Sequence, residues 1–182
     1  MEPLALVERL ADTEIGDTFN QYADSELRRE RLRMHLERDV PIVLVGEAAG
    51  YRGARISGIP FTSERQLTGS GPAEATATIV HRVLATLGVD DEVLLWNVVP
   101  THPGTETSNR RPTRAEIEAA APFLGELTRG RTAIAVGRLA AAALEAPYVR
   151  HPSHGGAAEF EAGLRRSFAT IGRRRASVRR FL

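Results

Sequence analysis

The chain has 182 residues, 42% of them hydrophobic, which suits one domain with a core of its own. It contains no cysteine, and this excludes disulfides, thiolate zinc sites, a cysteine nucleophile and a cysteine-bound iron–sulfur cluster. No stretch reaches about 18 consecutive apolar residues and no secretory signal is visible, so we expect a cytoplasmic protein without a membrane span.

The net charge of +1 conceals a bias in the kind and position of the charges. All 24 basic residues are arginine, whose planar group suits phosphate oxygens. After Glu161 the chain has no acid but seven arginines, at positions 165, 166, 173, 174, 175, 179 and 180. Such a basic end fits a polyanionic partner, and it equally fits a solvated, disordered tail.

Helices and strands alternate through the first half of the chain. Two helices are predicted over residues 4–10 and 25–38, followed by a short buried strand over residues 41–45 that ends at Gly46. A glycine-punctuated loop follows. A helix with Pro72 in its first turn then runs to residue 87, where Gly88 stops it, and a second strand covers residues 92–98.

The second half repeats this alternation. A polar loop with two prolines leads to a capping box, Thr113 to Glu116, which starts a helix that ends near residue 129. A strand (132–136), a helix (138–145), a short strand (147–150) and a last helix (157–169) precede a basic tail from about residue 170. The pattern predicts one domain, 1–182, of the α/β class: a three-layer α/β/α fold around a mostly parallel four-stranded central sheet.

Polar side chains follow three of the predicted strands. Glu47, Asn97 and His151 each lie at or just past a carboxyl end, and a parallel sheet brings such ends to one rim. Together with Phe61 they could bind a planar ring that forms hydrogen bonds. Each also has an ordinary structural explanation, as a surface acid, a turn residue, a helix cap or a core aromatic.

Other chemistries fit the sequence less well. His151 and His154, with His102 as a possible third ligand, lack the HExxH pattern or a carboxylate partner at metal-site spacing, so no metal site is expected. The chain has no G-x-S-x-G elbow for a serine hydrolase. It also has neither a P-loop nor a GxGxxG fingerprint in its glycine-rich segment.

Four motifs together resemble those of the uracil-DNA glycosylase superfamily. GEAAGYRGARISGIPFTSE, from Gly46, resembles its first motif, most closely in the branch with Gly-Glu-Ala-Pro-Gly followed by Gly-x-Pro-Phe. NVVP, from Asn97, with NRRPTRAEIEAAAPFL is similar to that branch's strand end and helix. HPS, from His151, resembles the second motif, and AIAVGRLAAAAL resembles the unit between them. The resemblance covers residues 41–168 in the right order.

The resemblance implies a monofunctional DNA-repair glycosylase that extrudes uracil or a related deaminated base from DNA and hydrolyses its N-glycosidic bond. Glu47 would position the attacking water or stabilise the cationic sugar, and His151 would stabilise negative charge on the leaving base. Base binding would fall to Phe61, which stacks, and to Asn97, Tyr51 and Ala48. DNA would be held by Ser63, Ser153, His154, Gly155 and Arg52.

The resemblance further implies a monomer that binds single- or double-stranded DNA near the nucleoid and needs no metal or organic cofactor. This chain departs from the family pattern at Ala49, where the motif has proline, and at Gly50, where the best-known branch has a thymine-excluding tyrosine. It lacks the iron–sulfur cysteines, and His154-Gly155-Gly156 replaces an apolar wedge. An alternative function is therefore a non-catalytic binder of modified nucleic acid or of a free nucleobase on the same fold.

Overall fold

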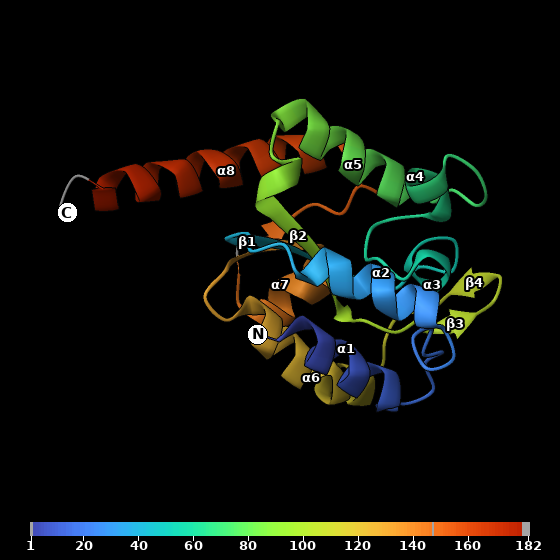
Figure 1. Ribbon diagram of the computed structural model, residues 1–182. Coiled ribbons are helices and arrows are strands. Elements are labelled where there is room, and N and C mark those ends of the chain that lie inside the picture. Colours follow the sequence, from blue (N-terminus) through green and yellow to red (C-terminus); the bar gives the residue numbers. More distant parts are fainter. Residues whose placement is uncertain (1, 147, 180–182) are drawn as a thin grey trace.

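The computed structural model describes residues 2–146 and 148–179, and its centre is a sheet of four parallel strands (Figure 1). The strands are β1 (Ile42–Ala48), β2 (Val93–Val99), β5 (Thr132–Val136) and β6 (Tyr148–Val149), in the order β2-β1-β5-β6. The helices are α1 (Pro3–Asp12), α2 (Glu26–Leu36), α3 (Ala54–Ser57), α4 (Glu64–Thr68), α5 (Ala75–Leu87), α6 (Arg114–Thr128), α7 (Arg138–Leu144) and α8 (Ala157–Arg179). The predicted α/β class with a parallel four-stranded sheet is confirmed.

Helices cover both faces of the sheet because successive strand residues point to opposite sides. In β1, Val43 and Val45 pack into the core that is shared with α1, α2, α6 and α7. Ile42 and Leu44 face the other core, which is built with α5 and α8. Both faces of the central strand are thus buried, as its unbroken apolar run requires.

The central strand is longer than the sequence indicated. We predicted an end at Gly46, but β1 continues to Ala48 because β2 continues to Val99 and pairs with it, Gly46 with Asn97 and Ala48 with Val99. Glu47 consequently projects from a hydrogen-bonded strand end rather than from a loop.

The segment between β1 and α5 is more ordered than a loop. It contains α3 and α4, and α5 begins at Ala75 rather than at Pro72. The carbonyl of Pro72 accepts a hydrogen bond from the backbone N–H of Arg65 (3.2 Å), which ties this turn to α4 and delays the helix start. The predicted polar loop after β2 likewise holds a two-stranded hairpin, β3 (Gly104–Thr105) with β4 (Ser108–Asn109).

The last helix also exceeds its predicted end at residue 169. Phe168 and Ile171 pack against the core, and the arginines that follow favour helix, so α8 runs to Arg179. The first part of the predicted basic tail is therefore helical, while residues 180–182 lie outside the described residues. In Figure 1 this end of α8 projects to the left, away from the β3–β4 hairpin on the right.

Across residues 2–146 and 148–179, no helix is both long and apolar enough to cross a membrane.

Candidate active site

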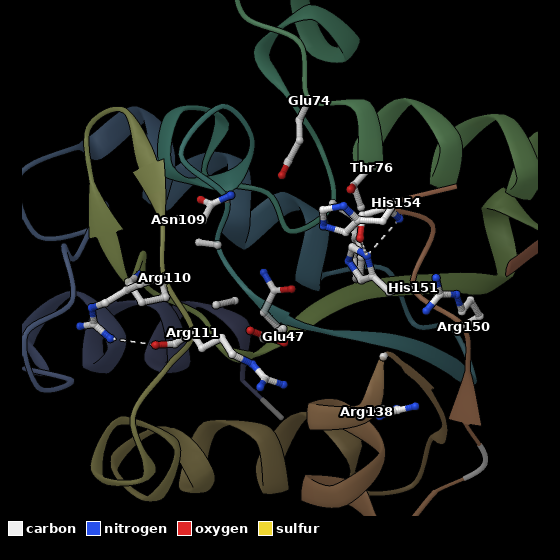
Figure 2. Close-up of a pocket in the computed structure, with 18 of the residues that line it drawn as sticks. Glu47, Glu74, Thr76, Asn109, Arg110, Arg111, Arg138, Arg150, His151 and His154 are labelled. Atoms are coloured by element: carbon white, nitrogen blue, oxygen red, sulfur yellow. Dashed lines mark hydrogen bonds between the residues drawn. The ribbon is translucent and has the colours of Figure 1, made fainter. Parts of the chain in front are cut away.

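A cavity of about 440 Å³ opens where β1, β2, β5 and β6 end (Figure 2). Glu47, Phe61, Asn97 and His151, which are remote in sequence, all line it. Ala48, Ser153 and His154 line it as well. The parallel sheet therefore brings together the acid, the ring, the amide and the imidazole that the sequence singled out.

Phe61 and Asn97 meet at the backbone of Gly46. A Cβ atom on Gly46 would lie 2.3 Å from Cζ of Phe61 and 2.7 Å from Oδ1 of Asn97. Phe61 has a left-handed backbone with φ of 53°, which is rare for an aromatic residue and marks a position held by its surroundings. Asn97 is only 3% exposed, and its amide forms no hydrogen bond with the described residues. A ring and an unsatisfied amide thus stand side by side in the cavity wall.

Glu47 is half-buried, and its carboxylate has no hydrogen-bond partner among the residues that the structure describes. Burial raises the pKa of Glu47, while the charge of Arg111 lowers it in part. Figure 2 shows the Arg111 and Glu47 side chains beside each other at the lower side of the cavity. The carboxylate oxygens of Glu47 are therefore free to accept hydrogen bonds, and the pKa of Glu47 depends on its burial and on Arg111.

The hydrogen bonds of His151 assign its tautomer. Its Nδ1 accepts from the backbone N–H of Ser153 (3.2 Å) and lies 2.8 Å from the Ser153 hydroxyl. Because a backbone N–H can only donate, the neutral ring carries its proton on Nε2. Burial, followed by the charges of His154 and Arg150, lowers the pKa of His151. At neutral pH the imidazole is thus an uncharged donor.

Comparison with known proteins agrees with this geometry. The family model described as "Uracil DNA glycosylase superfamily" matches residues 34–173. The chain belongs to this superfamily. Among solved structures it is similar to wild-type SMUG2 of Pedobacter heparinus, with a TM-score of 0.68 and 14% identity over 95% of this chain and 99% of that one. That likeness concerns the fold. No curated protein matches the chain.

Four of the residues that the superfamily resemblance proposed for contacts do not line the cavity: Tyr51, Arg52, Ser63 and Gly155. Ser63 is fully buried, and its hydroxyl donates to Gln66 in the capping box of α4, so it is not placed to hold a phosphate. The backbone N–H of Tyr51 donates to Asn109 (2.9 Å), and the guanidinium of Arg52 lies 5.5 Å from the Tyr51 ring.

The cavity lining also contains arginines that the sequence did not predict as site residues. Arg110 lines it but is bound by the buried carboxylate of Glu116. Arg111, Arg138 and Arg150 are exposed and form no ion pair with the described residues. Arg110 and Arg111 belong to the NRRP motif, which was noted without a role for its arginines. Arg138 directly follows Gly137, and Arg150 directly precedes His151. That adjacency was the available signal.

Glu74 is a second acid in the cavity lining, and the sequence did not predict it there. It occupies the cap position of α5 but does not cap the helix. Its carboxylate instead lies against two glycines of the segment after β1, where a Cβ on Gly50 or Gly53 would come within 2.3 Å or 1.9 Å of it. Burial raises the pKa of Glu74. Glycines at these positions therefore leave room for an acid from a different element.

No group of three histidine and carboxylate side chains in the described part of the chain could hold a metal ion. Both ring nitrogens of His102, considered above as a possible third ligand, face backbone carbonyl groups instead. They lie 2.7 Å from the carbonyl of Ala49 and 2.8 Å from that of Thr105. This buried imidazole joins the end of β1 to the β3–β4 hairpin.

Proposed function

We propose that the protein is a monofunctional DNA glycosylase that hydrolyses the N-glycosidic bond of uracil or a related deaminated base in DNA. The observation that carries this proposal is the convergence of Glu47, Phe61, Asn97 and His151 on one cavity. Membership of the uracil-DNA glycosylase superfamily supports it.

The cavity provides the groups that a flipped base needs. The ring of Phe61 offers a stacking surface, and the free amide of Asn97 offers one donor and one acceptor to a base edge. A base inside the duplex could not reach these groups, so it must leave the stack before reaction.

The reaction can then use groups of the chain alone. The C1′–N bond breaks, its electrons pass to the base, and positive charge grows on the sugar. The ionised carboxylate of Glu47 stabilises that charge and takes a proton from the water whose oxygen attacks C1′. Nε2–H of His151 donates to an oxygen of the leaving base, where the negative charge develops.

DNA binding would use the cations around the opening. Arg111, Arg138 and Arg150 line the cavity together with Ser153 and His154, and guanidinium groups that form no ion pair with the described residues suit phosphate oxygens. These contacts would fix the strand without reading its sequence.

The test is an assay of purified protein on an end-labelled oligonucleotide with one uracil, followed by alkaline cleavage at abasic sites. We expect product from the wild type, and a rate at least about 100-fold lower for Glu47→Gln and for His151→Leu. Glu8→Gln, on an exposed position of α1, is the matched control and should retain the wild-type rate.

Absence of abasic product from the wild type would reject the glycosylase proposal. Tight binding of the uracil oligonucleotide without product would instead select the alternative, a non-catalytic binder on the same fold.

A further inference from the structure

Tyr148 is an exposed aromatic residue at the edge of the cavity. Its exposed fraction is 47%. Among the large hydrophobic side chains that are exposed in the described residues, it is the one that lines this cavity. A ring that is so exposed adds little to the core, so we look for a role of Tyr148 in its neighbours at the cavity edge.

Tyr148 and Arg150 stand on either side of Val149 in the sequence, and both line the cavity. β6 is the edge strand and pairs with β5, Ala135 with Tyr148 and Val136 with Val149. Val149 is buried against α8, where a Cβ on Gly163 would lie 3.0 Å from its Cγ1. Because side chains alternate along a strand, Tyr148 points to the face of the sheet opposite Val149, away from α8. Arg150 follows the end of the strand, and its Nε would lie 3.1 Å from a Cβ on Gly156, in the turn before α8.

The same register places a second arginine nearby. The backbone N–H of Gly137 donates to the carbonyl of Val149 (2.9 Å), so Arg138, the next residue, begins α7 beside residue 150. Figure 2 shows Arg138 and Arg150 on the side of the cavity that carries His151. Neither side chain forms an ion pair within the described part of the chain, so both are available to an external anion.

We propose that Tyr148, Arg138 and Arg150 form a subsite for the nucleotide next to the flipped one, in which Tyr148 stacks on that neighbouring base and the two arginines hold its phosphates. An aromatic ring flanked by cations is the composition of a sequence-tolerant base platform. The inference rests on the proposed function, since it places the neighbour of a base that occupies the cavity.

The turn after His151 offers no substitute for this ring. Its one hydrocarbon side chain, Pro152, is buried, and its exposed residues are His154 and Gly155. Phe61 is 7% exposed and belongs to the inner wall. A base in a single strand can leave its neighbours and reach Tyr148 more cheaply than a paired base, so the subsite favours single-stranded DNA.

The experiment uses 2-aminopurine, whose fluorescence falls when it stacks, immediately 5′ or 3′ of uracil in a single-stranded oligonucleotide. All proteins carry Glu47→Gln to prevent turnover. At saturation we expect at least about twofold lower fluorescence at one of the two positions with Tyr148 than with Tyr148→Ala, and recovery of the low value with Tyr148→Phe. Affinity should fall about tenfold with Tyr148→Ala, and less on duplex DNA.

Phe19→Ala is the matched control. Phe19 is also an exposed aromatic beside an arginine, at 45% exposure and 4.8 Å from the guanidinium of Arg55, but it does not line the cavity. It should leave the fluorescence unchanged. The double variant Arg138→Ala, Arg150→Ala should reduce the slope of log affinity against log salt by about 1.4, the value for two single-strand phosphate contacts.

If the fluorescence is the same with Tyr148 and with Tyr148→Ala at both positions, while the wild-type protein still releases uracil, the proposed subsite is wrong. The proposed glycosylase activity would stand. Failure of the wild type both to bind and to cleave the oligonucleotide would overturn both.

Discussion

The ring of Phe61 packs directly on the backbone of Gly46, because a methyl group at Gly46 would lie 2.3 Å from Cζ of the ring. The same missing side chain gives space to the amide of Asn97. The Phe61 ring and the Asn97 amide, the proposed stacking surface and base-binding group, thus share one requirement, a residue without a side chain in β1.

Gly46→Ala should disable the cavity. The new methyl group must displace the Phe61 ring or the Asn97 amide, and we expect kcat/KM on uracil DNA to fall about 100-fold and stability to fall by about 1–3 kcal/mol. Gly125→Ala is the control. Nothing lies within 4 Å of a Cβ at this α6 position, so the change should stabilise the protein by about 0.5–1 kcal/mol and leave activity intact. Unchanged activity of Gly46→Ala would contradict the assigned stacking surface.

Glu47 should set the acid limb of the pH–rate profile. The carboxylate must be ionised to act, and burial raises its pKa. As the pH is lowered, the single-turnover rate should therefore begin to fall at a higher pH than the pKa of an ordinary glutamate would predict. Arg111 lowers this pKa, so Arg111→Ala should raise it and move the limb to higher pH. Arg82→Ala, exposed on α5, should not move it. A limb that stays in place, or moves to lower pH, in Arg111→Ala would speak against Glu47 as the titrating group.

His151 should act as a neutral donor. Its pKa is lowered, so the imidazole is already neutral at neutral pH. The rate should therefore not fall as the pH rises through neutrality. Ser153→Ala should cost less than about tenfold in rate, because the backbone N–H of Ser153 still holds Nδ1. Single-turnover rates from pH 5 to pH 9 test both points. A rate that falls as pH rises through neutrality would require a charged imidazole instead.

Glu116 should contribute pH-dependent stability. Its carboxylate binds Arg110 and the N–H of Thr113 (2.8 Å), and the hydrogen bond from Arg110 lowers its pKa to about 2. Since the folded pKa lies below the unfolded one, this stability is complete above about pH 4.5 and is lost as pH falls toward 2.

Glu116→Gln should therefore lower the free energy of unfolding by about 2 kcal/mol at pH 6 and by less at pH 3, as measured by urea denaturation. Glu118→Gln on the same helix breaks only an exposed pair with Arg114 and should cost less than about 0.5 kcal/mol at either pH. An equal loss for the two variants would refute the role of burial.

The end of α8 should add affinity for DNA without touching the cavity. Truncation after Gly172 removes five arginines and keeps Phe168 and Ile171 in the core. We expect weaker DNA binding and a shallower salt dependence, while the cleavage rate at saturating protein stays the same, because this helix end projects away from the hairpin side of the molecule (Figure 1). An unchanged salt slope would assign these arginines to solvent.

The sequence by itself determined the α/β architecture and the nucleus of the site. Apolar runs that alternate with capped helices allow few arrangements besides a parallel sheet, and a parallel sheet gathers strand ends on one rim. Glu47, Asn97 and His151 could be placed together for that reason. Phe61, the aromatic residue behind Pro60, was added to them from the sequence, and in the structure it lines the same cavity.

Only the tertiary structure decided which other side chains reach the cavity. Glu74 enters because Gly50 and Gly53 leave space for it, and Tyr148 and Arg138 line the same cavity because β5 and β6 pair in one register. Ser63 turns inward because Gln66 completes its capping box. Local patterns report the position of a residue along a strand or helix. The direction of its side chain depends on packing between elements that are distant in the chain, and no local pattern records it.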